Sequence, residues 1–249
     1  MPTPFYHLNI AENLLGHPDL SETARSFLLQ NRAAFLFGNT APDVQVISGQ
    51  PREATHFFEL PIHAADQPAW DRFLKTHPSL ASPGVLPAAQ AAFLAGYLCH
   101  LQADWLWVLQ VFAPVFGPAC SWASFDHRLY LHNVLRAYLD RDIPLALPDG
   151  MSALLSAAVP MRWLPFVDDL HLCTWRDKLA GQLQPGAAVQ TVEVFAVRQG
   201  LSPAAYYRLL ASDDNMDEEI FSRLPRQNLD AYRQQLIAWN VRLLKGYLV

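Results

Sequence analysis

His100 and Asp104 are the residues of this chain whose types and spacing most directly suggest chemistry. They stand four positions apart in residues 93–111, a segment that is otherwise almost wholly apolar. In a helix, side chains at this spacing lie on one face, and a carboxylate facing a core is costly unless it is paired or binds a metal. One imidazole nitrogen and one carboxylate oxygen on a helix face suit a cation such as Zn²⁺. The pair therefore indicates a metal site, while an arginine partner for Asp104 remains the alternative.

Three further residues extend this candidate site. His7 lies in a short helical pattern near the start of the chain, Asp43 follows Pro42 in a loop, and His56 precedes two phenylalanines. With the first pair they provide three imidazoles and two carboxylates, which suit one or two zinc ions that share a carboxylate. Each residue also has an ordinary structural explanation. A lone buried histidine is more often a hydrogen-bonded core residue, and an aspartate after a proline is common in turns.

The composition favours one folded domain with a large core. The chain has 249 residues, of which 51% are hydrophobic and 16% are charged, and it contains no long linker, charge run or repeat. We therefore expect a single domain over residues 1–249 and no extended disorder. The net charge of −5 provides no electrostatic footprint for a nucleic-acid partner. The three cysteines are too few and too scattered for a disulfide framework.

The N-terminal segment and the longest apolar run bear on localisation. The first residues lack the basic and apolar regions of a signal peptide. Residues 86–117 are apolar enough to test as a membrane span, but His100, Gln102, Asp104 and Gln110 interrupt them. A buried central helix is the better interpretation of this run. We expect a cytoplasmic protein with at most peripheral contact with a membrane.

Helical patterns follow one another along the chain, and no run alternates convincingly between apolar and polar residues. Residues 39–61 and 78–87 are rich in proline and are expected as loops. The predicted fold class is all-α, a single multi-helix bundle with a metal site among its central helices. From capping residues, prolines, glycines and periodicity, the expected helices cover residues 4–15, 21–37, 66–76, 87–112, 124–140, 152–159, 165–183, 187–199, 202–211 and 225–247.

Four pieces of the sequence form a recognisable series. They are His7, FLFGNTAPDV at residues 35–44, HF at residues 56–57 and GYLCHLQADWLW at residues 96–107. In this order they resemble the zinc-dependent phospholipase C family, over roughly residues 1–140. The resemblance implies an all-helical bundle with a metal cluster at one end of the central helices. This agrees with the all-α fold expected from the helical patterns alone.

The resemblance also implies a role for each candidate residue. Asp43, His56, His100 and Asp104 match a four-ligand zinc site, and Asp104 would bridge to a second ion that His7 binds. Asp43 would be the catalytic residue that orients or deprotonates the attacking water. Zinc ions in such a site neutralise the charge of a phosphodiester and activate a water molecule.

The sequence departs from the family pattern at the other metal positions. The prototype enzymes complete the second site with a free N-terminal tryptophan, whereas this chain begins with Met-Pro-Thr. Gln110 stands where a third-zinc histidine is expected, and the His-x-x-x-Glu pair of the next helix is not met. His127 and His132 are the nearest candidates for metal ligands there, and His132 could instead be a hydrogen-bond partner of a ligand. We expect one to three Zn²⁺ ions, with fewer than three favoured.

The substrate positions depart from the family pattern as well. Members that cleave phosphatidylcholine have an aromatic residue after the loop aspartate and another three residues before the next histidine. This chain has Val44 and Glu53 there, so the aromatic box that holds a quaternary ammonium lacks these parts. Other aromatic residues could line an apolar cleft or, as we favour, pack in the core; they are Phe57, Phe58, Trp105 and Trp107.

Motifs and residue types together favour a phospholipase C-like hydrolase of phosphate esters, with a phospholipid or another phosphodiester as substrate. Three alternatives stay open. The first is a nuclease or phosphatase on the same fold, of which the nuclease gains no support from the acidic net charge. The second is a catalytically degenerate domain that binds metal, lipid or protein, favoured by the incomplete third site. The third is an all-α interaction module with structural histidines, which predicts no stoichiometric metal.

Overall fold

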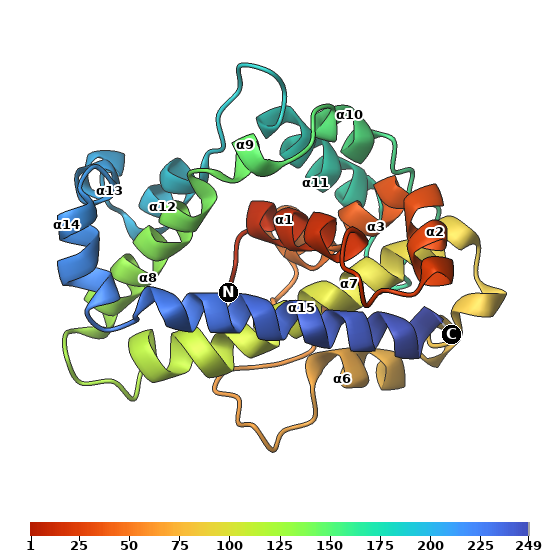
Figure 1. Ribbon diagram of the computed structural model, residues 1–249, viewed down its shortest axis with the longest axis horizontal. Helices are drawn as coiled ribbons and strands as arrows, with labels where there is room; N and C mark the ends of the chain where they lie inside the picture. Colours follow the sequence, from red (N-terminus) through yellow and green to blue (C-terminus); the bar gives the residue numbers. More distant parts are fainter. Residues whose placement is uncertain (249) are drawn as a thin grey trace.

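Two long helices, α7 (Ala88–Trp107) and α15 (Arg226–Leu248), lie side by side through the middle of the molecule (Figure 1). The computed structural model describes residues 1–248, apart from the side chains of residues 144 and 145. Within this range the chain forms helices and turns and contains no β-strand. The predicted all-α, multi-helix fold is therefore confirmed.

The other helices pack around this central pair. α1 and α3 contact α7 from the N-terminal part of the chain, and α6 contacts it from another side. The α-helices other than α7 and α15 are α1 (Pro4–Leu15), α2 (Glu22–Gln30), α3 (Arg32–Gly38), α4 (Gln45–Ser48), α5 (Glu53–His56), α6 (Ala69–Thr76), α8 (Phe125–Asp140), α9 (Ile143–Ala146), α10 (Met151–Ser156), α11 (Asp169–Gln182), α12 (Thr191–Gln199), α13 (Pro203–Leu210) and α14 (Asp213–Met216). The 3₁₀ turns are η1 (Ala41–Val44), η2 (Pro78–Leu80) and η3 (Pro83–Val85), and the π-helical segments are η4 (Val108–Phe116) and η5 (Asp217–Phe221).

The apolar run that could have been a membrane span is the central helix of the bundle. All of residues 91–107 are buried. A helix that is hydrophobic around its whole circumference needs neighbours on every side, which the surrounding helices provide. Among the described residues, no helix has the length and apolar character needed to cross a bilayer.

The central helix ends earlier than its sequence predicts. Residue 112 was the expected end, but regular α-helix stops at Trp107 and continues as the π-helical segment η4, which contains Pro114. Proline has no N–H and its ring clashes with the carbonyl four residues earlier, so an α-helix cannot pass through it unchanged. The wider π turn accommodates the proline at this end of the bundle.

The single helix expected over residues 21–37 is wrong, because Asn31 divides it into α2 and α3. Asn31 has φ −116° and ψ 31°, outside the helical range, and its side chain donates to the Phe27 carbonyl at 2.9 Å. The break lets α3 take its own direction, and α3 then packs along α7.

Two glycines allow this close packing of α3 against α7. A Cβ atom on Gly38 would lie 1.9 Å from the carbonyl oxygen of Phe93, and one on Gly96 would lie 2.2 Å from that of Phe35. No side chain can occupy either position without moving a backbone. The glycines of the GNTAPD and GYLCH pieces therefore hold the end of α3 beside the middle of α7.

The segment expected as a loop, residues 39–61, contains the short turns η1, α4 and α5. Gly49 ends α4 with φ +71°, a conformation that glycine adopts without strain. These turns bring Asp43 and His56 back over α7. The difference from the expected loop is modest, since each turn has only four residues.

Candidate metal centre

His7 is held by the start of α1. The Thr3 hydroxyl accepts a hydrogen bond from the Tyr6 N–H at 3.2 Å, and Pro4 occupies the first helical position. Both features stabilise a helix N-terminus. The helix then buries His7 to 1% exposure against α7.

His100 and Asp104 lie one turn apart on α7, as their spacing predicts. The His100 Nδ1 lies 2.8 Å from the Asn39 carbonyl oxygen, at the C-terminal cap of α3. A carbonyl only accepts, so Nδ1 carries the proton and the lone pair of Nε2 is free. The close approach at Gly96 places Asn39 for this contact, because a Cβ there would lie 2.8 Å from the Asn39 nitrogen.

Asp43 and His56 come from the short turns η1 and α5. The His56 Nδ1 lies 3.0 Å from the Thr55 hydroxyl, and the Thr55 carbonyl accepts a hydrogen bond from Tyr97 on α7 at 2.5 Å. The Thr55 hydroxyl also donates to the Arg52 carbonyl at 3.2 Å, so it accepts from His56. This arrangement again leaves Nε2 of the histidine free.

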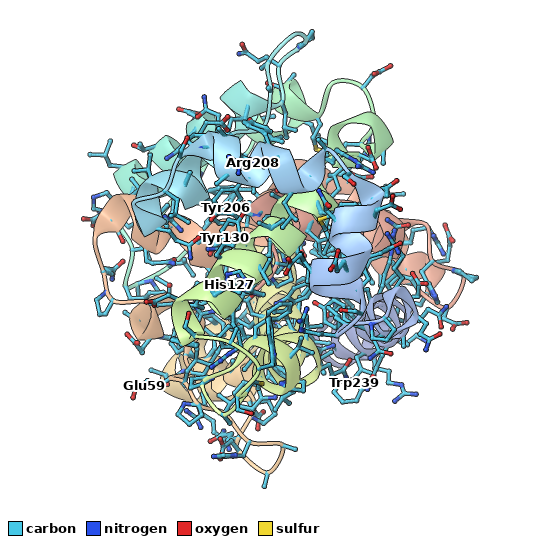
Figure 2. The ribbon with its side chains drawn as sticks, turned by 90° about the vertical axis from the view of Figure 1, so that its left-hand side faces the viewer. Glu59, His127, Tyr130, Tyr206, Arg208 and Trp239 are labelled. Atoms are coloured by element: carbon cyan, nitrogen blue, oxygen red, sulfur yellow. The ribbon has the colours of Figure 1, made fainter. Side chains whose placement is uncertain are left out.

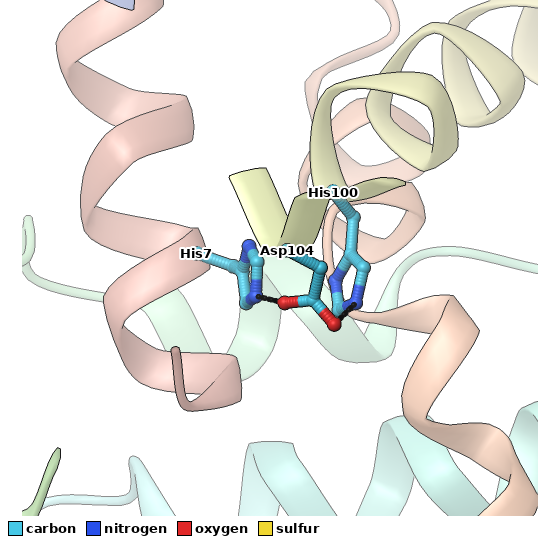
Figure 3. A group of neighbouring side chains, drawn as sticks. All are labelled: His7, His100 and Asp104. Atoms are coloured by element: carbon cyan, nitrogen blue, oxygen red, sulfur yellow. Dashed lines mark ion pairs between the residues drawn. The ribbon is translucent and has the colours of Figure 1, made fainter. Parts of the chain in front are cut away.

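The five residues meet in one cluster with Asp104 at its centre. Asp104 Oδ1 lies 3.3 Å from His7 Nε2, and Oδ2 lies 3.4 Å from His56 Nε2 and 3.7 Å from His100 Nε2. Figure 3 shows the carboxylate between the imidazoles of His7 and His100. Two sets of three ligand atoms lie within 4.8 Å of one another: His7, His100 and Asp104, and Asp43, His56 and His100.

The cluster fits a metal better than it fits hydrogen bonding alone. His7 Nε2 and Asp104 Oδ1 are buried, and neither has a hydrogen-bond partner among the described residues. Buried polar atoms without partners are costly, and a cation held by both would satisfy them. Imidazole nitrogens and carboxylate oxygens are ligands that zinc accepts.

Residues 6–107 match the model of the zinc-dependent phospholipase C family. By this match, residues 6–107 are similar to members of that family. The match contains all five residues of the cluster and ends with α7, so residues 108–249 lie outside it. Comparisons with curated proteins and with solved structures give no match. The family is one of zinc-dependent phospholipase C-like hydrolases, which agrees with the resemblance drawn from the motifs.

The protonation of the cluster suits the metal that the family name specifies. Burial lowers the pKa of His7 to about 4, and it also lowers the pKa values of His56 and His100. All three imidazoles are therefore neutral at pH 7 and keep a lone pair for a ligand bond. Burial opposes ionisation of Asp43 and Asp104, but the neighbouring imidazoles, and Arg52 beside Asp104, hold both carboxyl pKa values below their ordinary range.

Arg52 is a charged close neighbour of the cluster that the sequence analysis missed. Its Nη2 lies 2.6 Å from Asp104 Oδ2, and its guanidinium lies 4.5 Å from the ring centroid of Phe58. It stands four residues before His56, at the N-terminal cap of α5, and this spacing is the signal that could have found it. An arginine partner for Asp104 was the alternative to a metal, and the structure shows this arginine at a carboxylate that also belongs to a candidate ligand set.

His127 and His132, the two candidates for a third metal position in this phospholipase C-like chain, are not brought to the cluster. His127 is exposed on the outer face of α8, beside Tyr130 (Figure 2). His132 is buried, but its Nε2 accepts a hydrogen bond from the Trp107 indole at 2.9 Å. Neither belongs to the two ligand sets found in the described residues. A ligand role for either one stays a prediction.

The aromatic residues near the cluster are mainly core residues, as favoured above. Phe58, Trp105 and Trp107 are 3% exposed or less, and Phe57 packs against the core from its edge. Phe58 and Trp105 meet edge to face at 5.5 Å, and Arg52 covers Phe58. These rings are therefore engaged with each other and with a cation, and none is free to hold a quaternary ammonium.

Proposed function

We propose that this protein is a zinc-dependent phosphodiesterase that cleaves phospholipids in the manner of phospholipase C. The observation that carries the proposal is the Asp104 carboxylate between two sets of imidazoles. Its Oδ1 faces His7 and its Oδ2 faces His56 and His100, with distances of 3.3 to 3.7 Å. A carboxylate with one oxygen toward each set has the arrangement of a bridging ligand.

We assign the candidate residues to two ions, guided by the two ligand sets, which share His100. His7 and Asp104 would hold one, while Asp43, His56, His100 and the other Asp104 oxygen would hold the second. Bound zinc supplies charge neutralisation at the phosphate and lowers the pKa of a coordinated water. The protein contributes rigidity, because the backbone of α3 and the Thr55 hydroxyl orient two of the imidazoles before any ligand arrives.

Asp43 is the member of the cluster best placed to act on water. Its side chain is 21% exposed, whereas the side chains of His7, His56, His100 and Asp104 are at most 2% exposed. Its Oδ1 lies 3.6 Å from His56 Nε2, which leaves the other oxygen available. A water reaching the phosphorus from this side would donate its proton to the Asp43 carboxylate, and attack would release diacylglycerol and a phosphomonoester.

Arg52 favours a second candidate function, a binding domain without metal. The guanidinium already neutralises Asp104 at 2.6 Å, as an internal cation would in a degenerate site. Its ion pair is with Oδ2, which leaves Asp104 Oδ1 and His7 Nε2, 3.3 Å apart, without a hydrogen bond among the described residues. The phosphodiesterase is therefore the better-supported function, and the two candidates differ in metal content.

The deciding experiment is elemental mass spectrometry on protein purified without added metal. We expect one or two zinc ions per chain, lost in His100→Ala and Asp104→Ala and kept in His127→Ala, which removes an exposed histidine instead. Zinc-containing protein should release phosphomonoester from phospholipid vesicles, and chelation should stop the release. Folded protein that is free of metal and inactive on every phospholipid would overturn the proposal in favour of the binding domain.

A further inference from the structure

A group of three cationic side chains, the cationic trio, adjoins the metal centre outside the matched family segment. Arg136 of α8, Lys178 of α11 and Arg198 of α12 line one cavity of about 100 Å³ together with Asp43. Asp43 thus belongs both to the cluster and to this cavity. The cavity is the space beside the solvent-exposed side of the cluster.

The members of the cationic trio form no direct ion pair with a carboxylate in the described part of the chain. Among the described residues, no ion pair includes Arg136, Lys178 or Arg198. Asp177, next to Lys178 in sequence, pairs instead with Arg176 at 2.8 Å. Three positive charges and the single negative charge of Asp43 therefore line the cavity, in a chain whose net charge is −5. Such a concentration of positive charge attracts an anion.

Arg136 gives the cavity a fixed wall. Its Nη1 donates to the Asn133 side chain at 3.0 Å, and its guanidinium lies 4.3 Å from the ring centroid of Phe195. Its Nε is buried and has no hydrogen-bond partner among the described residues. A buried guanidinium donor without an acceptor is costly, so the site is built to receive one. Lys178 and Arg198 are exposed and complete the opening.

From these contacts we infer that the cationic trio recognises a second phosphate group on the head group of the substrate, next to the scissile phosphodiester. The inference rests on the proposed phosphodiesterase function. Guanidinium and ammonium groups bind phosphate through charge-assisted hydrogen bonds, with arginine able to bind two oxygens at once. The same charges repel a quaternary ammonium, so the cavity selects against choline while it selects for phosphate.

The test compares two lipids that differ only by the second phosphate. Phosphatidylinositol 4-phosphate and phosphatidylinositol are presented to the zinc-loaded protein in the same mixed micelles, with phosphatidylcholine as a third substrate. We expect kcat/KM for the 4-phosphate to exceed that for phosphatidylinositol by about 100-fold, as three charge-assisted contacts that are partly screened by solvent give together. In the double variant K178Q/R198Q this ratio should fall to about threefold, because Arg136 alone remains.

A matched double variant controls for the loss of two positive charges. R208Q/K245Q removes the same charge from α13 and α15, and neither residue lines the cavity (Figure 2 shows Arg208 on the outer surface). The control should keep the 100-fold preference of the parent protein. Arg136 is left unchanged because its replacement would also remove core packing against Phe195.

A binding measurement separates this inference from the hydrolase itself. Calorimetric titration of the zinc-loaded protein with inositol 1,4-bisphosphate and inositol 1-phosphate should show about tenfold tighter binding of the former, lost in K178Q/R198Q. If no lipid is cleaved but this preference and its loss are observed, the phosphodiesterase fails and the phosphate site stands. If the two lipids are cleaved equally, or the preference survives in K178Q/R198Q, the phosphate site is overturned while the hydrolase stands.

Discussion

The two parts of the molecule that meet at Asp43 are built on opposite principles. In residues 6–107, the side chains of the chemistry-bearing residues His7, His56, His100 and Asp104 are at most 2% exposed. They are neutral or anionic, and backbone and hydroxyl groups hold two of the imidazoles in place. In residues 108–248, the three charged side chains that line the adjoining cavity are all cationic, and two of the three are exposed.

The two parts therefore differ in their proposed tasks: the first holds metal and the second recognises the head group. A metal centre requires fixed geometry, and burial within packed helices provides it at the cost of dehydrating charged groups. Recognition of a head group tolerates long, mobile side chains at the rim of a cavity, because charge complementarity acts over a few ångströms without a fixed angle. Substitutions in the first part should therefore remove chemistry or stability, and those in the second should change selectivity.

The largest expected effect is at Asp43, where the two parts meet. Asp43→Asn keeps the size of the side chain and removes its basicity, so kcat should fall by roughly 10²- to 10⁴-fold. Zinc should be retained, because the amide oxygen can still act as a weak ligand beside His56 and His100. Turnover and elemental zinc content are measured on the same preparation. Near-normal turnover with full zinc content would rule out Asp43 as the base. The matched control is Asp126→Asn on the exposed start of α8, which should leave turnover unchanged.

The next largest effect is expected from a substitution that disturbs helix packing in the first part of the molecule. Gly96→Ala places a Cβ 2.2 Å from the Phe35 carbonyl oxygen, where only movement of α3 against α7 can relieve the clash. We expect a loss of about 1–3 kcal/mol in the free energy of unfolding, measured by urea denaturation. The same movement withdraws the Asn39 carbonyl from His100, so zinc affinity should fall as well.

Gly181→Ala provides the corresponding change in the C-terminal part. Gly181 lies in α11, and a Cβ there would meet nothing within 4 Å. Alanine has a higher helix propensity than glycine, so this variant should gain up to about 1 kcal/mol in the free energy of unfolding. Equal stability changes in the two variants would contradict the packing of α3 against α7.

The burial of His7 makes a third prediction, about pH. The folded pKa of about 4 lies below the ordinary value of 6.5, so below pH 6.5 the unfolded chain binds a proton that the folded chain does not. The stability that His7 contributes is therefore complete above pH 6.5 and is lost as the pH falls toward 4. Between pH 7 and pH 5 the loss from this residue should be about 2 kcal/mol in metal-free protein.

His7→Gln isolates this effect, because glutamine does not titrate. Asp140 opposes it, since burial raises the carboxyl pKa to about 6 and a rising pH therefore costs folded-state stability there. Asp140 is common to both proteins, so the difference between them cancels its contribution. We expect urea midpoints of the parent to fall more than those of His7→Gln between pH 7 and pH 5. Parallel midpoints would show that His7 is protonated in the folded protein.

Local periodicity explains which features of the fold and site were predictable. His100 and Asp104 lie on one face of α7 because helical spacing alone places them there. The signals that start and end α1 are equally local, and the bounds of this helix agree with the prediction. Asp43 and His56 were candidates by residue type, but only the family resemblance assigned them to one site, since the turns that carry them have four residues each.

The features that could not be predicted depend on contacts between distant parts of the chain. The break at Asn31 accompanies the docking of α3 on α7, and its neighbours Gln30 and Arg32 are ordinary helix formers that give no signal of it. Arg136, Lys178 and Arg198 meet at one cavity although up to 62 positions separate them, from 136 to 198. No local sequence pattern marks these residues, because what they have in common is that three separate helices place them beside the same cavity.

The smallest expected effect is at Arg52. This residue is a cation within the metal-binding part, so its substitution tests the contrast in charge between the two parts. Its Nη2 lies 2.6 Å from Asp104 Oδ2, an oxygen that the proposed zinc site requires. The guanidinium side chain is 23% exposed, so solvent screens part of its charge, and its repulsion of a divalent ion is moderate. Arg52→Gln should therefore tighten zinc binding by about tenfold, measured by competition with a chromophoric chelator.

The control for this change is Arg72→Gln on α6, which removes the same charge from an arginine outside the cluster. It should leave zinc affinity within about twofold of the parent, since screening by salt limits the reach of exposed charges. Unchanged or weaker zinc binding in Arg52→Gln would mean that the guanidinium moves away from Asp104 when the metal enters. In that case Arg52 would lie beside Phe58 at the edge of the metal centre. The metal site would then contain no cationic side chain, and it would differ more strongly from the cationic cavity.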